Sequence, residues 1–209
     1  MMSDMPKCTL PSGVCLIERE TSTSTSAELI ALAREGAAAL TLLTAKTQNK
    51  GHGQHGRPFF SPEGGAYFSL LLRPELHPDI AESVTITAAV AVSEACEARF
   101  GVTAGIKPVN DVLVNRKKVA GILAEAFDGA EGFFVVLGIG VNLATPRGGF
   151  PTEFPNAGAV STLTVDELEP TAIVDFIADV VTRFLRYFKI DDSTARREYD
   201  ARLLTTTYY

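Results

Sequence analysis

The most glycine-rich stretch of the chain, GHGQHGR, runs from Gly51 to Arg57. Its glycines follow the pattern G-x-G-x-x-G, which holds the pyrophosphate of a dinucleotide when a strand precedes it and a helix follows directly. An apolar, β-prone run precedes the stretch at 40–44, but Pro58 and Pro62 follow it and disfavour a helix. The dinucleotide interpretation therefore fails on context, and we predict a glycine-rich loop that closes over a different ligand.

Asn110 and Asp111 form a second candidate group, placed between two short predicted strands. Both residue types are ordinary in turns, so a structural role is one interpretation. A basic triplet follows at 116–118, and such triplets commonly form a solvated hairpin tip. The triplet also stands between apolar strands and beside Asp111, so a carboxylate for Mg²⁺ and a lysine for phosphate could face one pocket. The residues alone leave both interpretations open.

A third candidate group ends the apolar run at 132–142, where Gly138 and Gly140 precede Asn142. Glycine inside a strand allows a ligand or another backbone to approach closely. The amide at the end of the run adds a polar group at the same place. The stretch is therefore a candidate part of a binding site.

The composition limits the class of protein. The chain has 209 residues, 46% of them hydrophobic, and a formal net charge of −6. This is enough for one domain with a hydrophobic core, and the charge argues against general affinity for nucleic acid or anionic membranes. Cys8, Cys15 and Cys96 form neither a metal-ligand spacing nor an even disulfide set, which predicts a reducing setting. Without a signal-peptide pattern or a long apolar segment, we expect a cytoplasmic protein that does not enter the membrane.

The hydrophobic periodicity predicts the elements that must position these groups. Helices are expected at 25–36, 78–100 and 170–189, and strands at 40–46, 66–72, 102–107, 112–115, 119–127 and 132–139. Thr25 and Glu28 match a capping box at the start of the first helix, and Gly101 is a stop signal for the second. Asp128 and Gly129 predict a hairpin. Strands joined by hairpins, with helices between them, predict an α+β fold with a mixed, largely antiparallel sheet covered by helices.

Taken in chain order, the stretches resemble the catalytic domain of biotin protein ligases, clearly over 21–142 and more weakly to Arg202. That family has Ser-Thr-Asn before its first helix, then Gln, a loop of the form GRGRxGR, an aromatic residue and Ser-Pro. This chain has, in the same order, Ser24-Thr25-Ser26, Gln48, the loop 51–57, Phe59 and Ser61-Pro62.

Three further family motifs follow. They are Lys-Trp-Pro-Asn-Asp, matched at 107–111; Arg-Lys-hydrophobic-Ala/Ser-Gly-Ile-Leu-hydrophobic-Glu, matched at 117–125; and Gly-hydrophobic-Gly-hydrophobic-Asn, matched at 138–142. Each motif is weak alone, but five of them in the right order at compatible spacing are specific.

The resemblance implies a class II synthetase-like fold and a reaction in two steps. ATP with Mg²⁺ converts biotin to biotinyl-AMP, and a lysine of a biotin carboxyl carrier protein or domain then receives the biotin; a homodimer is compatible with it. The implied catalytic residues are Lys118 and Arg57. The implied biotin-binding residues are Ser24, Thr25, Ser26, Gln48, Gly51, His52, Gly53, Gln54, Lys118 and Gly121. The implied nucleotide-binding residues are Phe59, Asn110, Asp111 and Asn142, with Asp111 also as the Mg²⁺ ligand.

The chain departs from the family pattern mainly in the glycine loop. The loop has His52, Gln54 and His55, and of the family's loop arginines only Arg57 is kept. Phe59 stands where Trp is usual, and the pair 108–109 is Pro-Val where the family has Trp-Pro. The lost arginines favour one alternative, a non-catalytic or weakly active relative that binds biotin or its adenylate. A lipoate or octanoate transferase of the same superfamily is the other. A metal site of the two histidines is disfavoured, because no cysteine or carboxylate is near.

The lengths of sequence before and after the matched region determine the expected domain organisation. We expect an N-terminal leader at 1–20, a biotin/lipoate ligase-type catalytic domain at 21–190 and a charged, helical C-terminal tail at 191–209. The leader is too short for a DNA-binding domain, and the tail is too short for the small β-barrel that closes the family's fold. The expectation is therefore a minimal ligase or a truncated chain.

Overall fold

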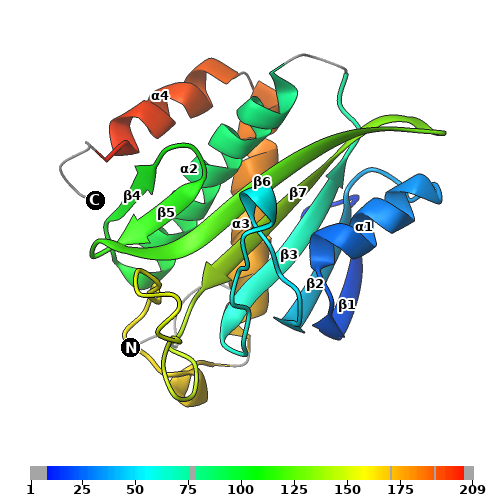
Figure 1. Ribbon diagram of the computed structural model, residues 1–209. Helices are drawn as coiled ribbons and strands as arrows, with labels where there is room; N and C mark the ends of the chain where they lie inside the picture. Colours follow the sequence, from blue (N-terminus) through cyan, green and yellow to red (C-terminus); the bar gives the residue numbers. More distant parts are fainter. Residues whose placement is uncertain (1–8, 76–78, 170, 191, 205–209) are drawn as a thin grey trace.

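A single seven-stranded sheet organises the computed structural model, which describes residues 9–75, 79–169, 171–190 and 192–204. Its strand order is β1-β2-β3-β7-β6-β5-β4 (Figure 1). The strands are β1 Cys15–Ser22, β2 Thr41–Gln48, β3 Gly65–Leu72, β4 Ala104–Lys107, β5 Asp111–Val114, β6 Lys117–Gly129 and β7 Gly132–Asn142. Only β1 and β2 run parallel, and the other neighbouring strands pair antiparallel. The predicted mixed, largely antiparallel sheet is confirmed.

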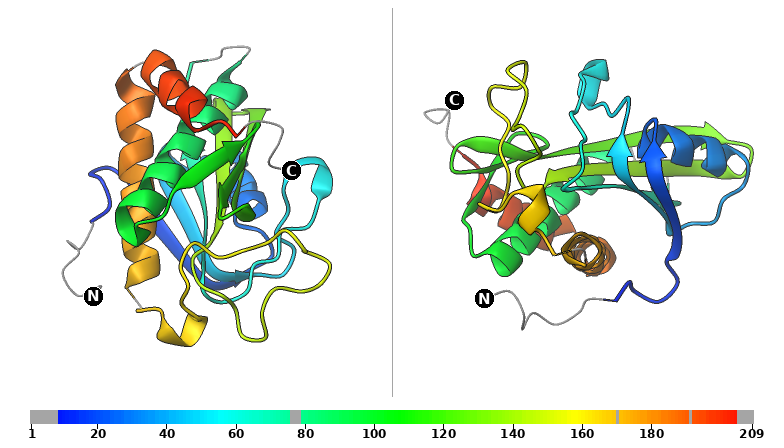
Figure 2. Two further views of the ribbon diagram at one scale, coloured as in Figure 1. Left: turned by 90° about the vertical axis from the view of Figure 1, so that its left-hand side faces the viewer. Right: turned by 90° about the horizontal axis from the view of Figure 1, so that it is seen from below.

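Helices cover both faces of this sheet, but unequally. The helices are α1 Thr25–Arg34, α2 Ile80–Phe100, α3 Ala172–Ile190 and α4 Asp192–Arg202, with short 3₁₀ turns at Gln54–Gly56 and Val165–Glu167. Figure 2 shows α2, α3 and α4 together on one face, whereas α1 and the two long loops, 49–64 and 143–164, lie on the other. None of the helices in the described part of the chain is long and apolar enough to cross a membrane.

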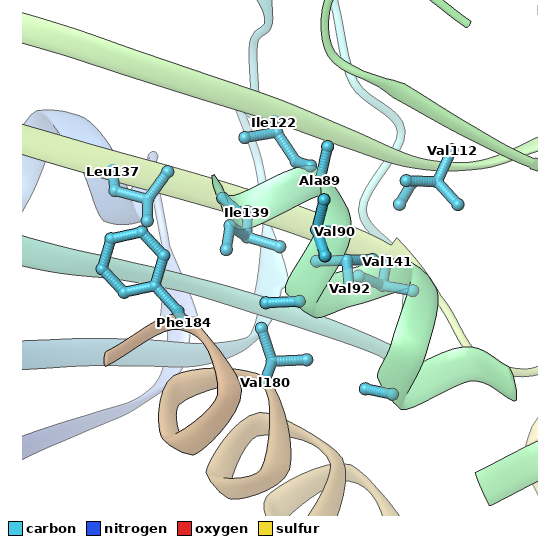
Figure 3. Close-up of a cluster of buried hydrophobic side chains, with 14 of the residues drawn as sticks. Ala89, Val90, Val92, Val112, Ile122, Leu137, Ile139, Val141, Val180 and Phe184 are labelled. Atoms are coloured by element: carbon cyan, nitrogen blue, oxygen red, sulfur yellow. The ribbon is translucent and has the colours of Figure 1, made fainter. Parts of the chain in front are cut away.

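The main hydrophobic core lies between the sheet and the helix pair α2 and α3. Val90 of α2 and Val180 and Phe184 of α3 point toward Leu137 and Ile139 of β7 (Figure 3). Both faces of β7 are covered, so it is a continuous apolar run rather than an alternating one. A rigid β6–β7 hairpin of this kind can hold site residues in fixed positions on the α1 face.

The start of α1 differs from the predicted capping box. Ser24, not Thr25, is the N-cap, and its Oγ accepts a hydrogen bond from the Ala27 amide at 3.4 Å. Glu28 does not return to the cap, because its carboxylate binds Ser22 and Arg19. The side chain of Thr25 is directed elsewhere, toward the site described below.

Two expected segment boundaries fall inside the fold. Residues 15–20, assigned to the leader, form most of β1, which pairs with β2. Residues 192–204, assigned to the tail, form α4 and then pair with the β4 edge, where the Leu204 amide donates to the Ile106 carbonyl at 2.9 Å. Tyr199 of α4 is buried and donates to the Val109 carbonyl. Residues 205–209 of the expected tail lie outside the described residues.

The stop signal predicted at Gly101 is confirmed and gives a stability test. Gly101 has the left-handed conformation, φ 65° and ψ 23°, and its amide donates to the Glu97 carbonyl at 3.0 Å. We expect Gly101→Ala to lower the free energy of unfolding by about 1 kcal/mol, because a Cβ is strained there. Gly101→Asn should cost less, since asparagine tolerates this conformation. Urea unfolding of both variants checks this, and equal stability of Gly101→Ala and the wild type would contradict it.

Candidate active site

A cavity of about 120 Å³ opens on the α1 face of the sheet, and we call it the α1 cavity. It lies where the N-terminus of α1, the glycine-rich loop and the β5–β6–β7 strands meet. Its walls are formed by Ser24, Thr25, Ser26, Gln48, His52, Gly53, Gln54, Arg57, Pro58, Phe59, Asn110, Asp111, Lys118, Gly121, Ile122, Leu123, Gly138, Ile139 and Gly140. Most site residues predicted from the sequence therefore lie together. Gly51 and Asn142 are the exceptions, and His55 does not line this cavity either.

A second cavity of about 150 Å³, the loop cavity, lies between the glycine-rich loop and the loop 143–164. It is lined by Pro58, Phe59, Phe60, Lys118, Asn142, Phe150, Phe154, Pro155, Asn156 and Ala157. Phe59 and Lys118 line both cavities, so the two spaces meet at an aromatic ring and an ammonium group.

Gln48 fixes the inner end of the α1 cavity. Its Oε1 accepts from the Thr25 amide at 2.8 Å and from the Thr25 hydroxyl at 3.2 Å, and its Nε2 donates to Ser61 Oγ at 3.0 Å. One side chain thus connects the first turn of α1 with the far end of the glycine-rich loop. The buried N-terminal amide of the helix is satisfied by this side chain rather than by a ligand.

The glycine-rich loop folds back on itself instead of starting a helix. The Phe59 amide donates to the Gly51 carbonyl, and the Gly53 amide donates to the Arg57 carbonyl, both at 2.8 Å. His52, Gln54 and Arg57 are exposed at its rim, where they line the α1 cavity. The rejection of a dinucleotide fingerprint is therefore consistent with the structure, in which a short 3₁₀ turn stands where that fingerprint needs a long helix.

Lys118 and Asp111 form an ion pair inside the α1 cavity. Lys118 Nζ lies 2.7 Å from Asp111 Oδ1, and the two side chains are 38% and 21% exposed. The β5–β6 hairpin brings them together, with a register shift between Val112 and Leu113. Lys118 Nζ also lies 5.9 Å from the centroid of the Phe59 ring. The second interpretation of this stretch, in which the acidic and basic groups face one pocket, matches the geometry.

The basic triplet is divided among three environments. Arg116 lies in the hairpin turn with φ 65°, and Lys117 donates to the Pro155 carbonyl at 2.9 Å. Only Lys118 enters the cavities. Asn110 is largely committed to the fold, since its Nδ2 donates to the Ile122 carbonyl at 2.8 Å. The interpretation of residues 116–118 as a solvated hairpin tip therefore applies to only part of the basic triplet.

Glycines in β6 and β7 make room for Phe59. Gly121 and Gly140 are directly opposite each other, and a Cβ on Gly140 would lie 2.6 Å from the Phe59 ring. Tyr67 contacts the same ring edge-on at 6.4 Å between centroids, and its hydroxyl donates to the Pro62 carbonyl. Burial raises the pKa of Tyr67, so this hydroxyl stays a neutral donor. The sequence predicted close approach by a ligand or another backbone, whereas the glycines here admit a side chain.

Asn142 lies at the inner end of the loop cavity. It is 6% exposed, and its Nδ2 donates to the Gly158 carbonyl at 3.1 Å. Its Oδ1 is buried and has no hydrogen-bond partner among the described residues. Such an oxygen carries a desolvation cost that a ligand N–H could offset.

The loop 143–164 is attached to the backbone of Lys118, a contact that the sequence did not predict. The Lys118 amide donates to the Asn156 carbonyl at 2.8 Å, and the Gly158 amide donates to the Lys118 carbonyl at 2.9 Å. Phe60 and Phe154 stack across the loop cavity with centroids 5.8 Å apart. Aromatic residues in a Pro/Gly-rich loop were the available signal, because such loops seldom need them for packing.

The fold, the paired cavities and the order of motifs define one class of protein. Residues 16–142 match the model of the Biotin/lipoate A/B protein ligase family, and the chain belongs to that family. The seven-stranded sheet with its helices is the fold found in solved biotin protein ligases. One from Aquifex aeolicus, in complex with biotin and ATP, has 25% sequence identity and a TM-score of 0.74, over 91% of this chain and 78% of that one.

Two curated relatives are ligases by name. The bifunctional ligase/repressor BirA of Bacillus subtilis is 33% identical over 168 residues, which cover 79% of this chain and 52% of the relative. The biotin--[acetyl-CoA-carboxylase] ligase of Paracoccus denitrificans is 39% identical over 140 residues, covering 66% of this chain and 55% of the relative. The chain thus spans about half the length of these relatives.

Proposed function

We propose that this chain is the catalytic domain of an ATP-dependent biotin protein ligase. It forms biotinyl-AMP and transfers biotin to a lysine of a carboxyl carrier domain. The observation that carries the proposal is the meeting of two cavities at Lys118, since an acid and a nucleotide must react at one point. The relative from Aquifex aeolicus, which is solved with both biotin and ATP, supports the same pair of ligands.

The first step joins biotin to the nucleotide. A carboxylate oxygen of biotin attacks the α-phosphorus of ATP, the bond from that phosphorus to the bridging oxygen breaks, and pyrophosphate leaves. Both reactants are anionic, so they need a cation between them. We assign this role to Lys118, which lines both cavities and is held by Asp111 before ligands enter. A preformed ammonium in a partly closed site stabilises the developing charge with little reorganisation.

Each cavity has groups suited to one ligand. The serine and threonine hydroxyls and the Gln48 amide of the α1 cavity suit the polar ring of biotin. In the loop cavity, the Asn142 Oδ1, which has no partner among the described residues, suits the amino group of a nucleobase, and Phe59 offers an aromatic surface beside it. Arg57, at the rim of the α1 cavity, would add a permanent positive charge near the adenylate.

A magnesium ion fits this site only as a companion of ATP. Within the described ranges no group of three or more His, Cys, Asp or Glu side chains could hold a metal, and Asp111 is the carboxylate that lines the α1 cavity. Mg²⁺ usually binds one or two carboxylates together with substrate phosphates and water. Asp111 would supply one ligand, and the ion would offset phosphate charge when bound.

The second step transfers biotin to the acceptor. The lysine amine of the carrier domain attacks the acyl carbon of biotinyl-AMP, an amide bond forms, AMP leaves and the amine loses a proton. The relative from Paracoccus denitrificans is named for an acetyl-CoA carboxylase acceptor, which supports a carboxyl carrier domain here. A cytoplasmic location follows from these substrates. The homodimer stays a prediction, which sedimentation equilibrium checks.

Pyrophosphate release tests the proposal and its alternatives. We expect ATP- and Mg²⁺-dependent release with biotin, and little with lipoate or octanoate. Addition of a purified carrier domain should then yield the biotinylated lysine, and a carrier whose acceptor lysine is replaced by arginine is the control. Pyrophosphate release with lipoate or octanoate alone would favour a relative of the same superfamily that activates those acids in place of biotin. A transferase, which receives its acyl group already activated, would release no pyrophosphate with any of the three acids. Biotin binding without pyrophosphate release would favour the weakly active relative.

The glycine under Phe59 gives a prediction for nucleotide binding. We expect Gly140→Ala to raise the dissociation constant for a non-hydrolysable ATP analogue about tenfold, because the new Cβ would displace the Phe59 ring. Gly132→Ala, at the other end of β7, is the control for backbone strain alone. A Cβ there meets no atom within 4 Å, but φ is 93°, so this variant should lose stability without losing affinity for the nucleotide. Calorimetric titration of both folded variants measures the effect. Unchanged affinity in Gly140→Ala would remove Phe59 from the nucleotide site.

A further inference from the structure

A chain of hydroxyl groups lies beneath the α1 cavity and includes one serine that no family motif covers. Ser69 of β3 is 0% exposed and lines neither cavity. Its Oγ donates to Thr25 Oγ1 at 2.9 Å and lies 3.0 Å from Ser26 Oγ. Thr25 Oγ1 donates in turn to Gln48 Oε1 at 3.2 Å.

Counting protons shows which group donates in each of these hydrogen bonds. The Thr25 backbone amide can only donate, so the Gln48 atom 2.8 Å from it must be the carbonyl oxygen. The Thr25 hydroxyl has one proton, which goes to that oxygen, and the Ser69 hydroxyl has one proton, which goes to Thr25. The contact between Ser26 and Ser69 therefore has Ser26 as its donor.

The consequence for the cavity is a fixed hydrogen-bond polarity. Ser26 lines the α1 cavity, but its proton points away from it toward Ser69. The Ser26 oxygen can therefore only accept a hydrogen bond from a ligand. Thr25, also on the wall, has its proton committed to Gln48. This end of the cavity favours a ligand that carries N–H donors.

The same chain continues into the glycine-rich loop. Gln48 Nε2 donates to Ser61 Oγ, and Ser61 Oγ donates to the Phe59 carbonyl, each at 3.0 Å. Gly51 leaves room for these groups, since a Cβ there would lie 2.7 Å from Ser61 Oγ and 3.0 Å from Gln48 Nε2. This is the structural reason for Gly51, which lies behind the cavity rather than in its wall.

We propose that Ser69 is a positioning residue that sets the ligand specificity of the α1 cavity. By accepting the proton of Ser26, it leaves acceptor oxygens facing the ligand, and these select a cyclic urea with its ring N–H groups. A saturated acyl chain such as octanoate offers no donor for them. The inference rests on the proposed function, because it concerns how the same site distinguishes biotin from other acids.

Removal of the Ser69 hydroxyl should reverse the polarity without touching the ligand. In Ser69→Ala the Ser26 proton loses its acceptor and can turn into the cavity, while Thr25 Oγ1 loses a donor. We expect the dissociation constant for biotin to rise about tenfold, the usual effect of one such hydrogen-bond mismatch. The rate of pyrophosphate release at saturating biotin should stay within about twofold, because Lys118 is not altered. Any weak binding of octanoate should be unchanged.

Ser93 provides a matched control. It is also 0% exposed, in α2, and its Oγ has no hydrogen-bond partner among the described residues. Ser93→Ala removes the same atom from a buried site that is not hydrogen-bonded to Ser26, Ser69 or Thr25. This variant should bind biotin like the wild type. Ser69→Cys keeps the shape with a weaker acceptor for the Ser26 proton and a weaker donor to Thr25, and an intermediate affinity is expected.

The outcomes separate this inference from the proposed function. Wild-type affinity for biotin in a folded Ser69→Ala variant, or an equal loss in Ser93→Ala, would overturn the role of Ser69 while the ligase function stands. A wild-type protein that binds no biotin would refute the function itself. Hydrogen exchange of the Thr25 amide, without any ligand, tests these hydrogen bonds separately. It should be faster in Ser69→Ala, and unchanged exchange would show that Ser69 does not hold Thr25 and Gln48.

Discussion

Replacement of Lys118 by alanine should slow the formation of biotinyl-AMP by about 10² to 10³, the effect of removing one preorganised electrostatic group. The ammonium lies where the two cavities meet, so its loss removes the charge that would offset both the carboxylate and the α-phosphate. Folding should change little, because the ion pair with Asp111 is partly exposed and such pairs contribute about 0 to 1 kcal/mol. Single-turnover pyrophosphate release, with a melting curve beside it, measures both effects.

Lys46 is the matched control for this variant. It forms an ion pair with Glu20 at 2.8 Å, like the pair of Lys118 with Asp111, but it lines neither the α1 cavity nor the loop cavity. Lys46→Ala removes the same charge and should leave the rate of adenylation unchanged. A folded Lys118→Ala variant that forms biotinyl-AMP at the wild-type rate would disprove the assignment of Lys118. An equal loss in both variants would point to net charge instead.

The sheet and its helices were largely predictable because local signals agreed with the global fold. The hairpin predicted at Asp128–Gly129 and the stop at Gly101 both depend on backbone preferences of a few residues, and both elements are present in the structure. The hairpin turn falls two residues later than predicted, at Ala130 and Glu131, because Asp128 and Gly129 pair with Phe133 and Gly132. The predicted boundaries at residues 20 and 190 do not coincide with the fold, because pairing or packing with a distant segment determines the structure there. Residues 15–20 become a strand because β2 pairs with them, and α4 belongs to the domain because Tyr199 is buried against it.

The sequence predicted most of the residues that line the α1 cavity, but not the contacts among them. Motif order identified Lys118 and Asp111, and hairpin geometry brings them to 2.7 Å. The capping box failed because Gln48, 23 residues away, occupies the amide and hydroxyl of Thr25. Ser69 gave no signal, since a lone serine in an apolar strand has no pattern. Contacts of this kind arise only when strands and loops far apart in sequence meet.

Replacement of Asp111 by asparagine should raise the apparent KM for Mg²⁺-ATP by about ten- to a hundredfold, while the dissociation constant for biotin changes less than about twofold. The amide keeps the size of the side chain but loses the anionic charge that a hard cation prefers. A turn aspartate without a ligand role would leave the KM for Mg²⁺-ATP unchanged, because such substitutions change stability by about 0.5 kcal/mol or less and do not alter the site. Steady-state kinetics with ATP varied at fixed free Mg²⁺ and calorimetry with biotin measure the two quantities.

The ion pair with Lys118 offers a competing explanation, which a magnesium titration resolves. If Asp111 acts only by holding Lys118, Asp111→Asn would impair biotin and ATP use together, and the Mg²⁺ concentration for half-maximal rate would not move. If Asp111 binds the ion, that concentration should rise in the variant. Asp128→Asn, at the exposed far end of β6, is the control and should match the wild type in all three measurements. An unshifted Mg²⁺ requirement in Asp111→Asn would assign the carboxylate to Lys118 alone, and the ion would then depend on the phosphates of ATP.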